Sequence, residues 1–363
     1  MEFYIVVFVF FLFLSASGLF GYSRPSPKSM IFLIFMLGVF VALRFEVGSD
    51  WENYRNYYYT GIAEDKASGE TDIGFAFLRK ICYSLGFSHV FFFYLISVSS
   101  LLAIYKAALL FKVENIYIVF LVYLALFFCN FQFNIVRNGA MASFSWLAFA
   151  YKATGSTKRA WVWALVACSL HIVGLVFIPM MLLIDRKWSR KFIIFVLGTG
   201  IVLFILKFGQ RLISLFPILS IIDRVSGYVD SDRNEGYGLS IGLIFNIALF
   251  LYFFLKYRNE YDNNTPLRVS LNAMLVNIFL CLSLNTFETI VARIGQPLNM
   301  ASLFIWPFLL YHIRKKPYKI IISFFLLFYL SLYYYKSWGT ENAVGETPML
   351  PYKMELSQVF EKK

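Results

Sequence analysis

The chain consists mainly of apolar segments separated by short polar loops. Ten such segments stand at 2–22, 29–44, 89–111, 115–133, 138–153, 191–207, 239–257, 267–286, 294–313 and 318–335. Each is about 16–24 residues long, which suits a helix that crosses a hydrocarbon core of roughly 30 Å. Of the 363 residues, 60% are apolar and 15% are charged, whereas a soluble domain carries roughly 25% charged residues. The sequence therefore predicts an all-α, polytopic integral membrane protein with about ten transmembrane helices.

The segment 2–22 lacks a basic start and is too long for the apolar part of a cleavable signal, so we expect it to be the first span. No internal repeat is evident. We therefore expect a single membrane domain over residues 1–363.

One further apolar segment, 160–184, is long enough to cross once, but the charges argue against a crossing. If both of its ends are cytoplasmic, the cytoplasmic loops hold 18 Lys and Arg against 4 Asp and Glu, and the rest of the chain holds 15 against 17. Cytoplasmic loops of membrane proteins carry such an excess of Lys and Arg. We therefore predict a re-entrant or broken element over 160–184, bent near His171 and Gly174, with both chain termini outside.

Three polar regions then lie on the external side. The loop 45–88 contains "RFEVGSDWENYRNYY" at its start, at Arg44–Tyr58, and the amphipathic stretch "DIGFAFLRKICYSLGF" near its end. The loop 208–238 is acidic toward its end. The third region is the C-terminal tail, 336–363.

The stretch Arg44–Tyr58 is unusually polar and aromatic for the mouth of a membrane helix. Arg44 stands at the end of a span, where an arginine can simply extend its charge to the interface. Asp50 follows a Gly-Ser turn, where aspartate is common as a helix cap. Trp51, Tyr54 and Tyr58 recur at helical spacing and form one aromatic face. Such a face is typical of membrane interfaces, and it could also stack on sugar rings.

Four further polar residues lie at span ends or within apolar segments. Arg137 precedes a run of small residues, and an arginine at membrane depth is expected to face a cavity or a counter-charge. His171 falls at the predicted bend, where a structural role is the alternative. Glu288 and Arg293 flank the start of a span and could form an ion pair. Guanidinium groups bind phosphate oxygens bidentately, so Arg44, Arg137 and Arg293 together indicate a site for a phosphorylated, membrane-borne substrate.

Several other chemistries have no support in the sequence. The four cysteines, at 82, 129, 168 and 281, show no metal-ligand spacing, so we expect no metal site. The P-loop, GxGxxG, HExxH and GxSxG signatures are absent. The net charge of +12 sits in short loops, which argues against a nucleic-acid partner.

The order of these motifs resembles the EpsG-like branch of the Wzy-type bacterial polysaccharide polymerases. The matching pieces are "RFEVGSDWENYRNYY", "DIGFAFLRKICYSLGF", "FQFNIVRNGAMA", "ACSLHIVGLVFIP", "ETIVARIG" and "PMLPYK", in this order over about residues 40–350. Asn138 stands where the family often has a glutamine, and Ile172-Val173 stand where it often has Lys-Ser.

The resemblance implies a GT-C-like glycosyltransferase of the bacterial inner membrane, active at the periplasmic face in the synthesis of O-antigen, part of lipopolysaccharide, or of a related surface polysaccharide. Such a polymerase moves the growing glycan from undecaprenyl pyrophosphate to the non-reducing end of a lipid-linked repeat unit. It would need no cofactor, and its partners would be the lipid-linked oligosaccharide, membrane lipid and a chain-length regulator.

In that setting the candidate residues take specific roles. Arg44, Arg137 and Arg293 would bind pyrophosphate, and Trp51, Tyr54 and Tyr58 would bind the glycan. A general base must remove the proton of the acceptor hydroxyl. We expect Asp50 to be that base, with Glu288 and His171 as the next candidates.

Three other functions fit a membrane protein of this kind. A transporter or flippase of lipid-linked glycan would be non-catalytic, but such proteins often show repeated halves. An O-antigen ligase would usually have a larger external loop than 208–238. For a membrane O-acyltransferase, His171 would be the single hint.

Overall fold

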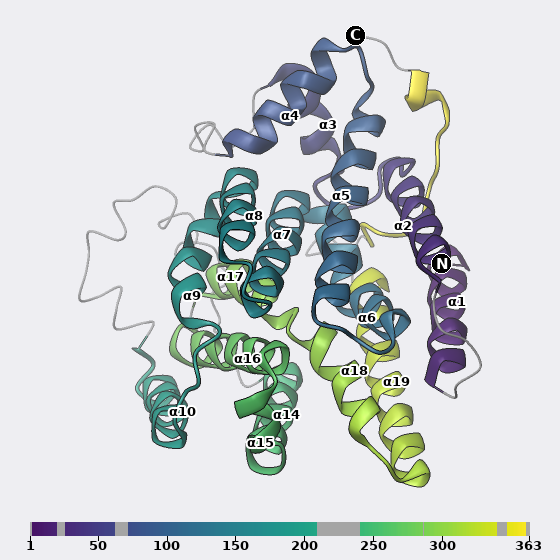
Figure 1. The fold of residues 1–363 in the computed structure, drawn as a ribbon. Helices are drawn as coiled ribbons and strands as arrows, with labels where there is room; N and C mark the ends of the chain where they lie inside the picture. Colours follow the sequence, from purple (N-terminus) through teal and green to yellow (C-terminus); the bar gives the residue numbers. More distant parts are fainter. Residues whose placement is uncertain are drawn as a thin grey trace. The chain divides into compact units, whose positions relative to one another are not determined.

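The described parts of the chain are helical throughout apart from turns and one isolated backbone bridge (Figure 1). The structure is a computed structural model, and it describes residues 2–19, 26–61, 72–208, 240–285, 287–339 and 347–360. The loop 208–238 predicted to be external lies outside the described residues, except for its first residue.

The helices have the following bounds: α1 Glu2–Leu19, α2 Pro27–Ala42, α3 Trp51–Thr60, α4 Ile73–Ser84, α5 His89–Leu110, α6 Ile116–Tyr123, the π-helix η1 Leu124–Asn134, α7 Val136–Ala153, α8 Thr157–Leu170, the short 3-10 helix η2 Ile172–Val176, α9 Phe177–Leu183, α10 Arg190–Ile205, α14 Ile241–Lys256, α15 Arg258–Asn263, α16 Thr265–Ser283, α17 Glu288–Asn299, α18 Ser302–His312, α19 Lys316–Gly339 and the 3-10 helix η3 Ser357–Phe360.

Helical structure lies at each of the ten predicted spans, which confirms the all-helical class and is compatible with a membrane protein. Within the part of the chain that the structure describes, four helices are long and apolar enough to cross a membrane: α5, α6 together with η1, α16 and α19. Shorter apolar helices include α2 and α14. The number of spans stays a prediction.

The predicted span 294–313 is not one continuous helix. α17 ends at Asn299 and α18 begins at Ser302. Pro297 lies inside α17, and a proline there removes one helical hydrogen bond. The Ser302 hydroxyl donates to the Asn299 carbonyl at 2.8 Å and so satisfies one of the acceptors left at the end of α17.

The chain packs as two compact units, residues 1–175 with 303–363 and residues 176–302. In the first unit α7 packs on α8 and α5, α2 on α5, α1 on α6, and α19 on η1. In the second unit α16 is central and contacts α10, α14, α15 and α17. The sequence predicted a single membrane domain, and how the two units combine in the membrane stays a prediction.

The predicted break in 160–184 is present at the expected residues. α8 ends at Leu170, and His171 has an extended backbone with φ −157° and ψ 135°. The next residues form the 3-10 helix η2. At Gly174 the chain lies so close to α8 that an added Cβ would stand 2.7 Å from the Cα of Cys168. The element is therefore broken as predicted, while its return to the cytoplasmic side stays a prediction.

The π-helix η1 ends at Asn134, and α7 begins at Val136, one residue before Arg137. Its last turn approaches α7 closely, because a Cβ on Gly139 would stand 2.5 Å from the Phe131 carbonyl oxygen. π-Helical turns are rare and often mark functional sites. The small residue after Arg137 thus permits the sharp change of direction that starts α7.

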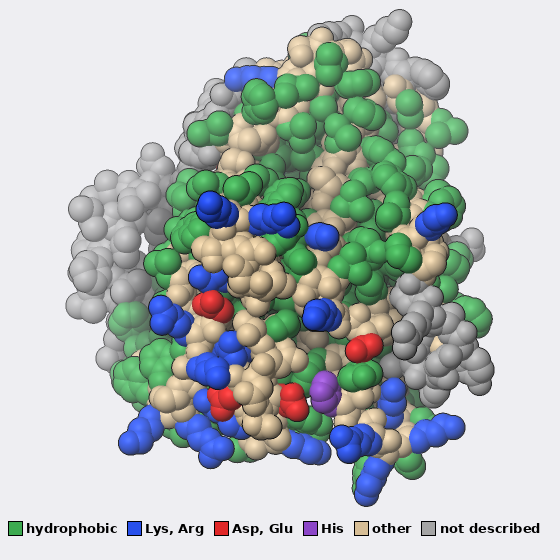
Figure 2. Space-filling model, in the orientation of Figure 1, with side chains coloured by type: hydrophobic (Ala, Val, Ile, Leu, Met, Phe, Trp, Pro, Cys, Tyr) green, Lys and Arg blue, Asp and Glu red, His purple; other side chains and the backbone are tan. Residues whose placement is uncertain are grey.

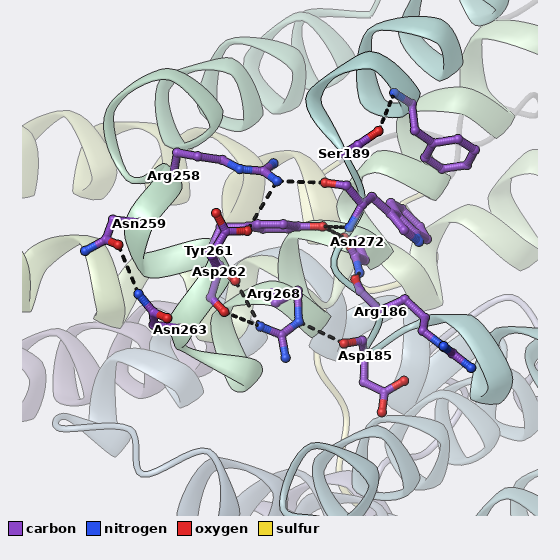
Figure 3. A network of polar contacts seen from close by, with 12 residues as sticks. Asp185, Arg186, Ser189, Arg258, Asn259, Tyr261, Asp262, Asn263, Arg268 and Asn272 are labelled. Carbon is purple, nitrogen blue, oxygen red and sulfur yellow. Dashed lines mark hydrogen bonds and ion pairs between the residues drawn. The ribbon is translucent and has the colours of Figure 1, made fainter.

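The second unit contains a network that joins two predicted cytoplasmic loops, 185–191 and 256–268 (Figure 3). Arg268 donates to the Asp185 carbonyl at 2.8 Å and to the Tyr261 carbonyl at 3.1 Å. Arg258 donates to the Trp188 carbonyl at 2.8 Å and lies over the Tyr261 ring at 4.5 Å. Because these donors serve backbone carbonyls, the network stabilises the fold of this unit.

Close packing of α4 on the last turn of α8 depends on Gly74. A Cβ there would stand 2.8 Å from the Cβ of Ser169 and 3.0 Å from its carbonyl oxygen. We expect Gly74→Leu to destabilise the protein by about 1–3 kcal/mol through overpacking. A lower midpoint of thermal unfolding in detergent would show this. Gly198→Leu is the matched control, because nothing lies within 4 Å of a Cβ at that helical glycine. Equal stability of both variants would contradict the prediction.

Candidate functional site

Asp72 is the carboxylate at which three distant parts of the first unit meet. It precedes α4, is 5% exposed, and makes no side-chain cap to its own helix. Its Oδ2 pairs with Arg137 Nη1 at 2.8 Å. Its Oδ1 accepts from the Ile172 N–H at 2.9 Å, and His171 Nδ1 lies 3.1 Å from Oδ2. We call Asp72, Arg137 and His171 the Asp72 cluster.

The break after α8 positions His171 in this cluster. Its extended backbone interrupts the helix, and the Ile172 N–H that the break releases is bound by Asp72. A carboxylate at Nδ1 favours the tautomer with the proton on Nδ1, which leaves Nε2 with its lone pair. Among the described residues, Nε2 has no hydrogen-bond partner. The Asp72 carboxylate thus orients the His171 ring so that Nε2 can accept a proton.

Arg137 has the most accessible side chain of the Asp72 cluster. Its side chain is 33% exposed, against 7% for Asp72 and 11% for His171. One amino group pairs with Asp72, and the guanidinium also lies over the Tyr54 ring at 5.9 Å. Tyr54 also hydrogen-bonds to the guanidinium, so a phosphate would bind the exposed part of the fork.

Asp50 is the first residue before α3, but its side chain makes no cap to that helix. Burial raises the pKa of Tyr54, the charge of Arg137 lowers it and the charge of Asp50 raises it again. The charges of Asp50 and Arg137 thus act in opposite directions on the Tyr54 hydroxyl. The simple helix-cap role considered from the sequence is not what the side chain does.

A second buried charge, Arg44, is enclosed by the protein. It is 1% exposed, donates to the Val41 carbonyl at 2.8 Å, and lies 5.1 Å from the Phe93 ring centroid and 5.2 Å from that of Phe133. A phosphate could reach this guanidinium only if the enclosing side chains moved. The predicted phosphate role of Arg44 has no support in this geometry.

The C-terminal tail closes over Arg44. The Phe45 N–H donates to the Lys353 carbonyl at 3.0 Å, and the Gly48 N–H donates to the Pro348 carbonyl at 2.8 Å. Tyr352 stacks on Phe40 with centroids 4.4 Å apart. The tail and the loop at 43–48 therefore form one structure.

The predicted aromatic face of α3 exists, but it points into the protein. Trp51, Tyr54 and Tyr58 are 6%, 7% and 0% exposed. The Trp51 indole donates to the Arg44 carbonyl, and the Tyr58 hydroxyl donates to the Phe87 carbonyl. These contacts hold α3 in place, and the glycan-binding role of the three rings stays a prediction.

Two predicted site residues lie in the second unit. Glu288 begins α17, and its side chain is outside the described part of the structure. Arg293 is half-buried on the same helix. Their roles, and the sharing of one cavity by Arg293 with Arg137, stay predictions because the two units are described separately.

Sequence reasoning brought Arg137 and His171 forward but missed Asp72. The signal was an aspartate directly before an amphipathic stretch, which resembles an ordinary helix start. Its partners lie 65 and 99 residues away along the chain. No group of three or more His, Cys, Asp or Glu that could hold a metal occurs among the described residues.

The charge of Asp72 should contribute pH-dependent stability. Burial raises the pKa of its carboxyl, but His171, Arg137 and the Ile172 N–H together outweigh burial, so the pKa lies below its ordinary value. Stability from such a group is present above the ordinary pKa and is lost as the pH falls through the lowered pKa. An asparagine in place of Asp72 can still accept the hydrogen bond from the Ile172 N–H, but it carries no charge.

We therefore expect Asp72→Asn to be less stable than the parent by about 1–3 kcal/mol at neutral pH. This difference should shrink below about pH 4, as followed by thermal unfolding in detergent between neutral and acidic pH. Asp262→Asn, which removes the more exposed partner of an i,i+4 pair with Arg258, should change stability by less than about 0.5 kcal/mol. A loss at Asp72 that is the same at every pH would contradict the charge argument.

Comparison with known proteins agrees with the resemblance seen in the motifs. Residues 28–354 match the family model described as "EpsG family", a range that includes the whole Asp72 cluster. No curated protein and no solved structure shows significant similarity to the chain. The chain belongs to the EpsG family, which is related to the Wzy-like polysaccharide polymerases.

Proposed function

We propose that the protein is a polysaccharide polymerase that transfers a growing glycan from undecaprenyl pyrophosphate to the non-reducing end of a lipid-linked repeat unit, in the synthesis of O-antigen or a related surface polysaccharide. Family membership supports the polymerase class. The observation that carries the mechanism is Asp72, which holds an oriented histidine and a partly exposed arginine at one point.

The chemistry requires a base and a charge that stabilises the leaving group. His171 Nε2 takes the proton of the acceptor hydroxyl. The acceptor oxygen forms a bond to the anomeric carbon as the bond from that carbon to the pyrophosphate oxygen breaks. The electron pair of the broken bond stays on the pyrophosphate, where Arg137 stabilises it through the exposed part of its guanidinium.

Asp72 acts in this scheme as a positioning residue. It fixes the ring of His171 through Nδ1 and stabilises the imidazolium that forms when Nε2 takes up the proton. It also holds Arg137 at the same place. The proposal therefore prefers His171 to Asp50, the base expected from the sequence, because the histidine has a carboxylate partner and an unpartnered ring nitrogen.

The proposed location is the bacterial inner membrane, with the Asp72 cluster at the periplasmic face. Contacts within the first unit support the prediction that the external regions lie on the same side of the membrane. The N-terminal part of α1 contacts the tail, since the Tyr4 hydroxyl donates to the Met349 carbonyl at 2.9 Å. At the other end of α1, the Asn115 side chain donates to the Ser15 carbonyl at 3.2 Å, next to predicted cytoplasmic loops.

Loss of the proposed base should stop chain growth. We expect His171→Gln to lower the transfer rate by roughly 10²–10⁴, so that a gel of surface lipopolysaccharide shows a core with a single repeat unit. His312→Gln is the control, because this histidine lies in α18 next to the Phe308 carbonyl, and it should leave long chains unchanged.

Other outcomes of that gel would contradict the proposal. Normal long chains from well-expressed His171→Gln would exclude His171 as the general base, and Asp50 or Glu288 would then be the candidates for that role. A bare core with polymer retained on its carrier would indicate a ligase. The absence of any external lipid-linked unit would indicate a flippase.

The role of Arg137 depends on its shape as well as its charge. Lysine keeps the charge but lacks the planar fork that serves a carboxylate and a phosphate together. We expect Arg137→Lys to reduce polymer formation by roughly tenfold or more. A tenfold loss corresponds to about 1.4 kcal/mol of lost transition-state stabilisation. The same gel measures this effect.

Arg159→Lys is the matched control for Arg137→Lys. Arg159 lies over the Tyr151 ring at 5.9 Å, next to the turn at the other end of α7. Its replacement should have little effect on polymer length. Equal activity of both variants would exclude a bidentate role for Arg137.

A further inference from the structure

Helix α4 has one buried face and one exposed face, and the exposed face is apolar. The buried face contains Phe75, Ala76, Arg79 and Cys82. The exposed face carries four large apolar residues at a spacing of four, which we call the α4 stripe: Ile73, Phe77, Ile81 and Leu85 are 72%, 64%, 38% and 66% exposed. At 3.6 residues per turn this spacing covers an arc of roughly 120°. An exposed patch of this kind marks a protein or membrane contact.

The position of α4 in the chain places it at the end of a membrane span. Residues 85–88 connect it to α5, which begins at His89 and is long and apolar enough to cross the bilayer. A connection of four residues cannot carry α4 far from the end of that span. The α4 stripe therefore lies at the boundary between hydrocarbon and water.

The apolar surface continues from the α4 stripe onto the spans. Phe87 is 43% exposed, and its ring centroid lies 4.2 Å from that of Phe91 of α5, with the two rings tilted by 34°. The ring centroid of Tyr94 lies 6.5 Å from that of Phe91 and 6.5 Å from that of Phe35. Phe35 is 38% exposed on α2. Hydrophobic side chains also predominate in Figure 2 over α4 and the start of α5.

The other end of the α4 stripe adjoins the Asp72 cluster. Ile73 directly follows Asp72, and Ile172, whose N–H binds Asp72, is 36% exposed. Leu175 of the same broken segment is 54% exposed. Exposed apolar side chains thus lie on both chain segments that meet at Asp72.

We propose that the α4 stripe inserts into the acyl layer of the adjacent membrane leaflet and contacts phospholipid chains. The argument for lipid is continuity, because aromatic contacts extend the exposed apolar surface from Phe87 through α5 to Phe35 of α2. An interfacial amphipathic helix keeps its basic residues at the edge of its apolar face, and Lys80 is exposed beside the α4 stripe. The consequence is that the Asp72 cluster stands at the depth of lipid headgroups.

The test uses photo-crosslinking of the full chain in nanodiscs of phosphatidylethanolamine and phosphatidylglycerol with labelled acyl chains. The photoreactive p-benzoylphenylalanine replaces Phe77 in one variant and Leu85 in a second, so that the test does not depend on one protein folding. The control variant carries it at Asn53, which is exposed on α3. Label bound to the protein is counted after delipidation.

We expect phospholipid label at 77 and at 85 to exceed that at 53 several-fold. Label at 77 and 85 no higher than at 53 would overturn the proposal. A covalent dimer as the main product would overturn it too, because the α4 stripe would then bind a second copy of the chain. These results are independent of polymerase activity.

Discussion

A buried carboxylate, Asp72, binds a broken helix, an arginine and a histidine at one point. Burial of a charge is costly unless it is paired and hydrogen-bonded. Here the partners are a guanidinium, an imidazole and a backbone N–H that the break after α8 would otherwise leave unsatisfied. The break, the start of α7 and the start of α4 therefore depend on one side chain. Removing its charge should disturb all three.

The surrounding helices hold this point in place. Gly74 allows α4 to reach the last turn of α8, and Gly139 allows α7 to turn sharply out of the π-helix. Arg44 supports the loop before α3 from inside, under the C-terminal tail.

Local features of this fold could be predicted from the sequence, whereas contacts between distant segments could not. The lengths of the apolar segments predicted the helices, and the charge asymmetry of the loops predicted the break at His171. Both features of the sequence follow from the cost of polar groups in lipid. The periodicity of Trp51, Tyr54 and Tyr58 gave one face of α3, but not that this face is buried. Asp72 was missed because its partners come from two other helices. The enclosure of Arg44 was missed because the tail that covers it lies about 310 residues further along the chain.

The central claim is that Asp72 and His171 act as one unit in the transfer reaction. The most direct measurement compares initial rates of polymer formation for Asp72→Asn, His171→Gln and the double variant, with expression matched. Residues that act as a unit are strongly non-additive. The account predicts that the double variant is no slower than His171→Gln alone. A double variant slowed by the product of the two single effects would show that the two residues act independently and would contradict the account.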